Sequence, residues 1–122
     1  MVELGIWGGV NLYGDFIGVV IRGNTIQLNQ FNGIWADGVL TNAVISDNTI
    51  LNNSSSGADI NQGIQIVKAY ANITMSGNQV NDTRTPKLQS RGLYAPNGGT
   101  GVVFGNDLSG NLHDSIPGNP TP

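Results

Sequence analysis

Apolar and polar residues recur along the chain in a fixed order. In four segments an apolar residue stands three positions before an asparagine, and a second apolar residue stands two positions after it. These asparagines are separated by 24, 30 and 28 residues. A repeat of this length is typical of solenoid proteins, in which each repeat is one structural unit that stacks on the next. The four asparagines are Asn24, Asn48, Asn78 and Asn106.

A second motif, a glycine followed by an apolar and then a large residue, keeps the same rhythm, with steps of 28, 30 and 29 residues. Because side chains alternate between the two faces of a strand, the apolar residues of both motifs would point inward. They would then stack once per repeat, about 4.8 Å apart. The four copies are Gly5-Ile6-Trp7, Gly33-Ile34-Trp35, Gly63-Ile64-Gln65 and Gly92-Leu93-Tyr94.

Together the two motifs predict an all-β fold, a single-stranded parallel β-helix of about four rungs, where a rung is one turn of the helix. The core would come from stacking, because no rung buries apolar residues by itself. The repeat asparagines would bond to each other from rung to rung as an asparagine ladder, since a carboxamide both donates and accepts; ordinary turn asparagines are the alternative. We expect residues 1–114 to form the rungs. The proline-rich tail, residues 115–122, would end the repeat, because proline lacks a backbone donor.

The composition excludes several classes of function. Charged residues make up 11% of the chain, the net charge is −3, and the five Lys and Arg are too sparse to follow a phosphate backbone. No apolar run approaches the roughly 18 residues that span a bilayer, and the start of the chain lacks a basic signal-peptide region. Cysteine is absent, so disulfides and cysteine zinc sites are excluded. We therefore expect no nucleic-acid or membrane partner, and no metal or other cofactor.

The sequence of an apolar pair, then Gly-Asn or Asp-Asn, then another apolar residue resembles the pectin-lyase-like right-handed parallel β-helix superfamily. That group includes pectate lyases, polygalacturonase-like hydrolases and bacteriophage tailspikes. Residues 80–89, which lead into Arg91-Gly92-Leu93, look like its rung-closing loops, and residues 105–111 resemble a last rung. The resemblance implies a right-handed helix whose variable loops are residues 27–32, 51–62 and 81–91. In this superfamily sugars commonly bind outside the first sheet, between such loops.

The resemblance also implies a role for the chain. A rung begins almost at once, so the sequence resembles a carboxy-terminal segment of a longer helix. We expect a polysaccharide-binding segment of a surface appendage, a phage tailspike or related protein, at the extracellular or virion surface. Few rungs bury little core and expose a strand edge. We therefore expect a homo-oligomer, a trimer by analogy with tailspikes, or stacking on another β-helix chain.

The candidate binding residues follow the inward apolar residue of the second motif. Alternation sends them outward, where exposed tryptophans are costly unless they contact a partner. Sugar rings stack on such aromatic faces; a subunit interface or burial under a loop would also explain the column. We expect Arg84 and Lys87, in the loop before the last copy, to lie beside the column and to favour an acidic glycan. The column consists of Trp7, Trp35, Gln65 and Tyr94.

Candidates for catalysis are weaker. A glycoside hydrolase needs carboxylates at a defined separation, and Asp15 and Asp37 both follow the second motif in adjacent rungs, at different offsets. A lyase acting on uronates needs a cationic group and a base, for which the resemblance suggests Arg91. Solvated turn residues explain all three as well, so we expect no turnover from this chain alone. A polysaccharide lyase or glycoside hydrolase acting on acidic glycans, and a purely structural oligomerisation segment, stay open as alternatives.

Overall fold

The structure is a computed structural model that describes residues 2–3, 8–56, 60–116 and 120–121. All regular secondary structure in these residues is β-strand, mostly two or three residues long. The strands are β1 (Val2–Glu3), β2 (Val10–Leu12), β3 (Phe16–Ile17), β4 (Val20–Arg22), β5 (Thr25–Gln27), β6 (Ile34–Ala36), β7 (Leu40–Thr41), β8 (Val44–Ser46), β9 (Thr49–Leu51), β10 (Ile64–Ile66), β11 (Tyr70–Ser76), β12 (Gln79–Asn81), β13 (Leu93–Tyr94), β14 (Gly99–Phe104) and β15 (Pro120–Thr121).

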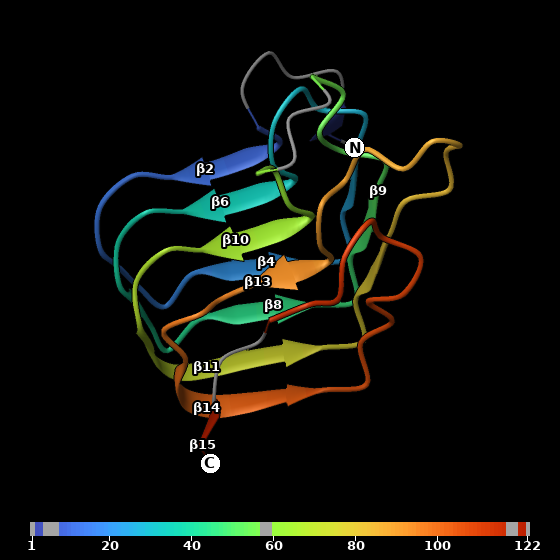
Figure 1. Cartoon of the computed structure of the whole chain (residues 1–122). Coiled ribbons are helices and arrows are strands. Elements are labelled where there is room, and N and C mark those ends of the chain that lie inside the picture. Colours follow the sequence, from blue (N-terminus) through green and yellow to red (C-terminus); the bar gives the residue numbers. More distant parts are fainter. Residues whose placement is uncertain (1, 4–7, 57–59, 117–119, 122) are drawn as a thin grey trace.

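The strands form three sheets around a common core (Figure 1). We number the sheets by the order in which the chain passes through them in each rung. The first sheet has the order β13-β10-β6-β2 and the third sheet β1-β5-β9-β12. The second sheet joins β15-β14-β11-β7-β3 to β4 and β8. Every strand pair in the described residues is parallel, which confirms the predicted parallel β-helix.

The described chain completes three rungs, formed by β2 to β5, β6 to β9 and β10 to β12. The fourth is less regular, because β13 and β14 are followed by a single bridge between Gln79 and Asp107. At that point Oδ1 of Asp107 accepts hydrogen bonds from the backbone amide and Oγ of Ser109, at 3.1 and 2.6 Å. Such local bonds compete with strand pairing. The helix therefore has about three turns, slightly fewer than the four rungs predicted.

The turn between the second and third sheets explains the Gly-Asn and Asp-Asn pairs of the repeat. Its first residue has a left-handed backbone in all four rungs, with φ between 55° and 67°. Glycine adopts this conformation without steric cost, and aspartate is one of the few other residues that tolerate it. Each pair is therefore a two-residue corner. The four left-handed residues are Gly23, Asp47, Gly77 and Gly105.

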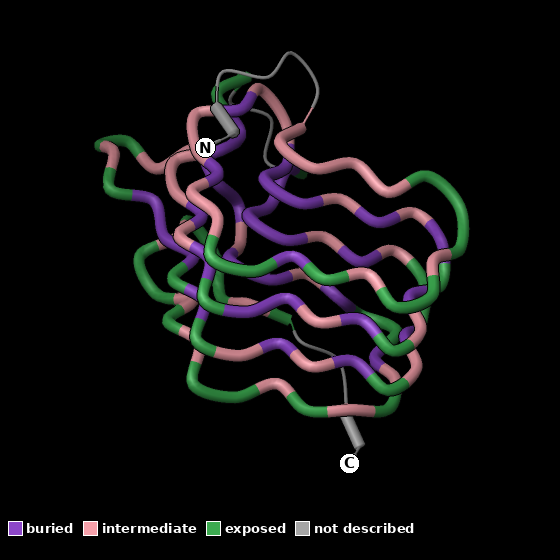
Figure 2. The backbone as a smooth tube through the Cα atoms, turned by 180° about the vertical axis from the view of Figure 1, so that it is seen from behind, coloured by how far each residue is buried: buried purple, intermediate pink, exposed green. Residues whose placement is uncertain are grey.

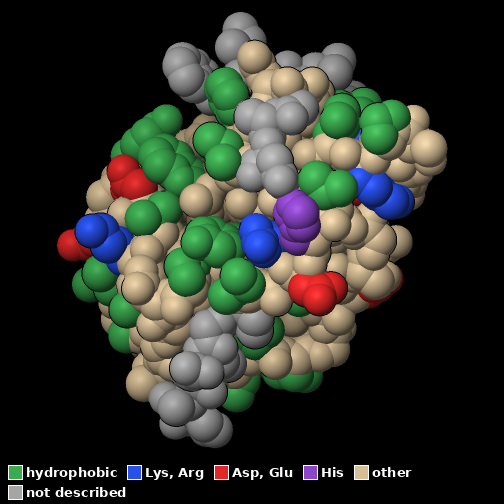
Figure 3. Space-filling view, viewed as in Figure 1, with side chains coloured by type: hydrophobic (Ala, Val, Ile, Leu, Met, Phe, Trp, Pro, Cys, Tyr) green, Lys and Arg blue, Asp and Glu red, His purple; other side chains and the backbone are tan. Residues whose placement is uncertain are grey.

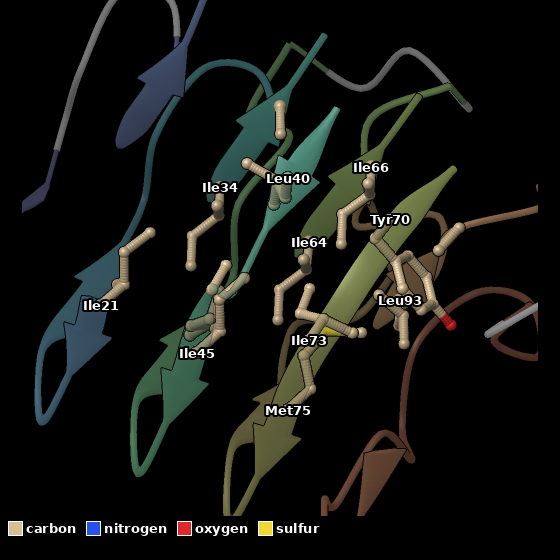
Figure 4. Packing of buried hydrophobic residues seen from close by; sticks show 14 of the residues in the cluster. Ile21, Ile34, Leu40, Ile45, Ile64, Ile66, Tyr70, Ile73, Met75 and Leu93 are labelled. Carbon is tan, nitrogen blue, oxygen red and sulfur yellow. The ribbon is translucent and has the colours of Figure 1, made fainter. Parts of the chain in front are cut away.

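The inward side chains of the three sheets form one core (Figure 4). Buried residues alternate with more exposed ones along the strands (Figure 2), as in β4, where Ile21 is buried between two exposed neighbours. Ile21, Ile45, Met75 and Val103 are in register from rung to rung, as the repeat predicted. Since burial of one such side chain stabilises a fold by about 1.5–3 kcal/mol, the stacked columns supply most of the driving force.

The predicted asparagine ladder is present. The backbone amide and Nδ2 of Asn24 both donate to Oδ1 of Asn48, at 2.9 and 3.3 Å. Asn48 donates in the same way to Asn78, at 3.1 and 2.9 Å, and Asn78 to Asn106, at 3.0 and 2.8 Å. Nδ2 of Asn78 also donates to the carbonyl oxygen of Ile45, at 2.9 Å. Each inner carboxamide thus ties its own rung to both neighbouring rungs.

The register that the second motif predicted is confirmed in three rungs and is wrong in the first. Ile34, Ile64 and Leu93 are in register as predicted. In the first rung, however, Val10 pairs with Ile34 and Asn11 with Trp35. The counterpart of Gly33-Ile34-Trp35 is therefore Gly9-Val10-Asn11 rather than Gly5-Ile6-Trp7. The corrected step from Gly9 to Gly33 is 24 residues, the same as the step from Asn24 to Asn48. Equivalent positions of two adjacent rungs are separated by the same number of residues as long as no loop is inserted between them.

The end of the chain stacks on the last rung. The backbone amide of Ile116 donates to the carbonyl oxygen of Leu93 at 2.8 Å, and its own carbonyl accepts from Ala95 at 2.7 Å. Further on, β15 pairs with β14. The proline-rich tail therefore continues the parallel pairing over part of the last rung, while the boundary at residue 114 stays a prediction.

Candidate functional site

The outer face of the first sheet carries the predicted column. Four half-buried residues occupy the same register position in successive strands: Asn11, Trp35, Gln65 and Tyr94. Trp7, which we expected in the first position, lies outside the described residues. Figure 3, in the view of Figure 1, shows groups of hydrophobic side chains on this side of the molecule, with charged side chains between and beside them. The four residues of the column itself, which form the floor of this face, are uncharged.

A second column lines one side of this floor, just before each strand begins. The register places Asn32, Gln62 and Arg91 at equivalent positions, each directly before the glycine that leads into β6, β10 or β13. Oδ1 of Asn32 accepts a hydrogen bond from the backbone amide of Gln62 at 2.6 Å. The guanidinium carbon of Arg91 lies 5.5 Å from the ring centroid of Tyr94, a cation–π contact. Arg91 therefore meets the floor two rungs away from Trp35.

An open pocket of about 220 Å³ lies where the two columns meet in the first two rungs. Trp35 forms its floor, and the ring of Tyr13 stands edge-on to it with 5.2 Å between the ring centroids and 81° between the planes. Loops on the other side add an aromatic ring and two carboxamides. The lining residues are Asn11, Tyr13, Phe31, Asn32, Trp35 and Asn61.

Several polar atoms of the pocket are available to a ligand, since the carboxamide of Asn11 and the hydroxyl group of Tyr13 make no hydrogen bond within the described residues. Oδ1 of Asn32 is bonded to Gln62, but its Nδ2 donates no hydrogen bond to any described residue. Asn61 donates from Nδ2 to Oγ of Ser56 at 3.3 Å, while its Oδ1 accepts none within the described chain. The pocket therefore offers several free donors and acceptors beside aromatic rings, among them Nδ2 of Asn32 and Oδ1 of Asn61.

Sequence reasoning missed most of this pocket. The motif at Gly5 points to Trp7 and away from Asn11 and Tyr13, whereas the strand pairing aligns the first rung on Gly9. Phe31, Asn32 and Asn61 lie in the variable loops and show no periodicity that would single them out. The corrected 24-residue step is the signal that would have placed Asn11 beside Trp35.

Arg84 and Lys87 organise their own loop around a buried carboxylate. Asp82 is 1% exposed, and it forms an ion pair with Arg84, with 2.8 Å between Nη2 and Oδ2. The backbone amides of Leu88 and Gln89 both donate to Oδ2 of Asp82 at 2.7 Å, and Lys87 donates from Nζ to the Asp82 carbonyl oxygen. Both cations are thus engaged within the loop.

The pKa of Asp82 follows from these contacts. Burial alone would raise the pKa of the carboxyl group. The Arg84 side chain and the backbone amides of Gln89, Arg84 and Leu88 outweigh burial and hold the pKa well below its usual range. Asp82 is therefore ionised at any ordinary pH and fixes the loop that precedes β13.

Asp15 and Asp37 lie in the turns between the first and second sheets, in adjacent rungs. Oδ1 of Asp15 accepts a hydrogen bond from the backbone amide of Val39 at 2.7 Å, and Oδ1 of Asp37 accepts one from Gly14 at 2.6 Å. Gly38 must be glycine, because a Cβ atom there would come within 2.1 Å of the Gly14 carbonyl oxygen. The two carboxylates tie neighbouring turns together, which is a structural role.

A second ladder, which the sequence analysis missed, holds the loops between the third and first sheets. The backbone amide and Nδ2 of Asn29 donate to Oδ1 of Asn53, at 3.2 and 2.9 Å. Asn53 donates from its amide to Oε1 of Gln89 at 3.0 Å, and Gln89 donates from Nε2 to Oδ1 of Asn111 at 2.7 Å. In three rungs the ladder residue follows a repeat asparagine by five positions, which is the signal in the sequence. These buried amides fix the loops that wall the pocket.

Two kinds of structure are absent from the described residues. Across the described ranges, no helix has the length and apolar character needed to cross a bilayer. In the same residues, no group of three or more His, Cys, Asp or Glu side chains is placed to hold a metal ion.

The comparisons with known proteins address the fold. A family model described as "Right handed beta helix region" matches residues 7–119. No curated protein and no solved structure gives a significant match. The matched range contains the three complete rungs, both ladders and the pocket, and the match agrees with the resemblance to the pectin-lyase-like superfamily. The chain belongs to the right-handed β-helix family.

Proposed function

We propose that the outer face of the first sheet binds polysaccharide, and that the pocket over Trp35 holds one sugar unit of the chain. The observation that carries this proposal is the combination of Trp35, Tyr13 and Phe31 with the carboxamides of Asn32 and Asn61. Sugar rings present apolar C–H faces to aromatic rings and hydroxyl groups to amides, which both donate and accept. The rung spacing of about 4.8 Å is close to the length of one sugar unit, so a glycan can run along the column.

Binding fits the geometry better than catalysis. A glycosidase needs one carboxyl group free to transfer a proton and a second free to attack or to activate water. Asp15 and Asp37 each use an oxygen to hold the neighbouring turn. Arg91 lies over the ring of Tyr94, and among the described residues it forms no ion pair with a carboxylate. We therefore place hydrolase and lyase activity second to binding.

Replacing Trp35 tests the proposal. Trp35→Ala is expected to weaken binding to a polysaccharide selected from a glycan panel at least tenfold, which is about 1.4 kcal/mol, because it removes the stacking surface. Isothermal titration calorimetry measures the affinity, and the melting temperature monitors the fold. Lys68→Ala, a change at an exposed residue outside the pocket, serves as the control. Equal affinity of the Trp35→Ala and wild-type proteins would rule out this site.

The wider setting follows from the family resemblance. We propose that the chain is part of a surface appendage of the tailspike kind, at the extracellular or virion surface. In such a setting a polysaccharide of the target cell would be the partner.

We also propose that the chain self-associates through the outer face of the second sheet. Ile17, Val20 and Phe104 are 79%, 62% and 60% exposed on this sheet. Arg22 is the one charged residue in the described strands of the sheet, and its Nε donates to Oγ of Ser46 at 3.0 Å. Because the face has almost no charge, two copies can meet without like-charge repulsion, whereas leaving this apolar surface in water is unfavourable.

Sedimentation velocity at micromolar concentration tests self-association. We expect a defined oligomer, a trimer by the family analogy, and we expect the double variant Val20→Lys/Phe104→Lys to be monomeric because buried lysines would lack partners. Ile60→Lys, at an exposed apolar residue in a loop outside the sheet, should leave the oligomer intact. A monomeric wild-type protein would contradict self-association. A stable dimer would contradict only the expected number of three subunits.

A further inference from the structure

We infer that the pocket over Trp35 accepts a neutral hexopyranose ring and discriminates against a uronic acid, an inference that rests on the proposed carbohydrate-binding function. The first reason is the lining itself. All six lining residues are uncharged: three are aromatic and three are carboxamides. A carboxylate entering such a site would lose hydration without gaining a cation, which costs far more than the transfer of a hydroxyl group.

The cations that would favour an acidic glycan are placed elsewhere. Arg84 is paired with Asp82, and Lys87 donates to the carbonyl oxygen of the same residue. Arg91 lies over Tyr94, two rungs from Trp35, which corresponds to about 10 Å along the helix. No Lys or Arg is among the described residues that line the pocket, so an anion entering it finds no counter-charge there.

The free polar atoms of the pocket match a hydroxyl group. Nδ2 of Asn32 is a donor and Oδ1 of Asn61 is an acceptor, and neither bonds to another described residue. A hydroxyl group donates and accepts at once, so one or two sugar hydroxyls satisfy both amides. An ionised carboxylate only accepts, so it can bond to the donors of the pocket but leaves the acceptor Oδ1 of Asn61 without a donor.

The size of the pocket sets the number of sugar units. Its volume of about 220 Å³ is smaller than the roughly 300–1,000 Å³ of sites that enclose drug-sized ligands. It therefore has room for one ring, and the rest of a glycan lies along Gln65 and Tyr94. The preference for a hydroxymethyl group over a carboxylate at C6 then concerns this single ring, so it can be measured with monosaccharides.

The test uses matched pairs of methyl glycosides. The methyl glucosides, galactosides and mannosides are titrated beside the corresponding methyl uronates, which differ only at C6. A Trp7→Phe background makes Trp35 the one tryptophan, so its fluorescence reports occupancy of the pocket. We expect at least one neutral glycoside to bind, and its uronate to bind at least tenfold more weakly.

The possible outcomes separate this inference from the proposed function. A uronate that binds as tightly as its neutral counterpart, with a Trp35 signal, overturns the preference but leaves carbohydrate binding at the pocket intact. Polysaccharide binding that depends on Trp35 while every monosaccharide fails to bind overturns the one-ring pocket. If neither polysaccharides nor monosaccharides bind, both the inference and the proposed function are wrong.

Two substitutions at Asn61 locate the hydrogen bond. Asn61→Leu removes the free acceptor and should weaken neutral glycosides about three- to tenfold. Asn61→Asp keeps an acceptor at this position, so it should stay within about threefold of wild type for the neutral sugar and weaken the uronate further. Asn97→Ala, at an exposed asparagine outside the pocket, is the matched control and should change neither. Unchanged binding by a folded Asn61→Leu variant would overturn the assigned contact, and the Asp variant decides the matter if the Leu variant fails to fold.

Discussion

Replacing Asp82 with alanine is expected to lower the free energy of unfolding by about 2–4 kcal/mol. The carboxylate is 1% exposed and accepts bonds from the Arg84 side chain and from the amides of Arg84, Leu88 and Gln89. Its removal leaves a guanidinium and buried amides without their acceptor. Because Gln89 belongs to the second ladder, the loss should spread to the loops beside the pocket. Urea denaturation followed by circular dichroism measures the change.

The same residue predicts a dependence on pH. The folded-state pKa of Asp82 is lowered from 3.8, so its contribution to stability is complete above the unfolded-state value and is lost as the pH falls below about 4. Each proton bound on unfolding in that range changes stability by about 1.4 kcal/mol per pH unit. Asp82→Asn, which keeps the shape, should therefore show a shallower loss of stability in acid than wild type.

Asp114→Ala is the matched control, because Asp114 is exposed. It should change the free energy of unfolding by less than about 0.5 kcal/mol. If the Asp82 variants were as stable as this control at neutral pH, the carboxylate would not organise the loop.

The second large effect is expected at Asn78 in the first ladder. Asn78→Ala should cost about 2–3 kcal/mol, because the carboxamide is buried and bonded on both sides. It accepts from Asn48, donates to Asn106, and donates to the Ile45 carbonyl oxygen in the core strand. Alanine leaves the amide of Asn48 and the carbonyl of Ile45 unsatisfied in the interior. Thermal and urea unfolding measure the loss.

Asn97→Ala provides the comparison with an exposed asparagine. Asn97 makes one hydrogen bond, from Nδ2 to the carbonyl oxygen of Val67 at 2.7 Å, at the surface. Its replacement should cost less than about 1 kcal/mol. If both replacements lowered the free energy of unfolding equally, the burial and ladder bonds of Asn78 would contribute nothing beyond one surface hydrogen bond.

The sequence by itself determined the fold and the first ladder. The offset between the apolar residues and the asparagine is identical in four segments, from Ile21 and Asn24 to Val103 and Asn106. A regular backbone converts such an offset directly into a position, because strand alternation and a two-residue corner leave no freedom between them. The stacking of Trp35, Gln65 and Tyr94 followed from the same regularity, and the structure confirmed their register.

Only the tertiary structure decided the first rung, the second ladder and the pocket. Gly5-Ile6-Trp7 matched the motif better than Gly9-Val10-Asn11, yet strand pairing selected the latter. Gln89 takes the ladder place in the third rung although it stands 36 residues after Asn53, because an inserted loop folds around Asp82 and returns the chain to register. The pocket joins residues of two strands and three loops. Local patterns specify which residues a rung repeats, but hydrogen bonds between rungs decide which residues of irregular loops meet, since loop length is not periodic.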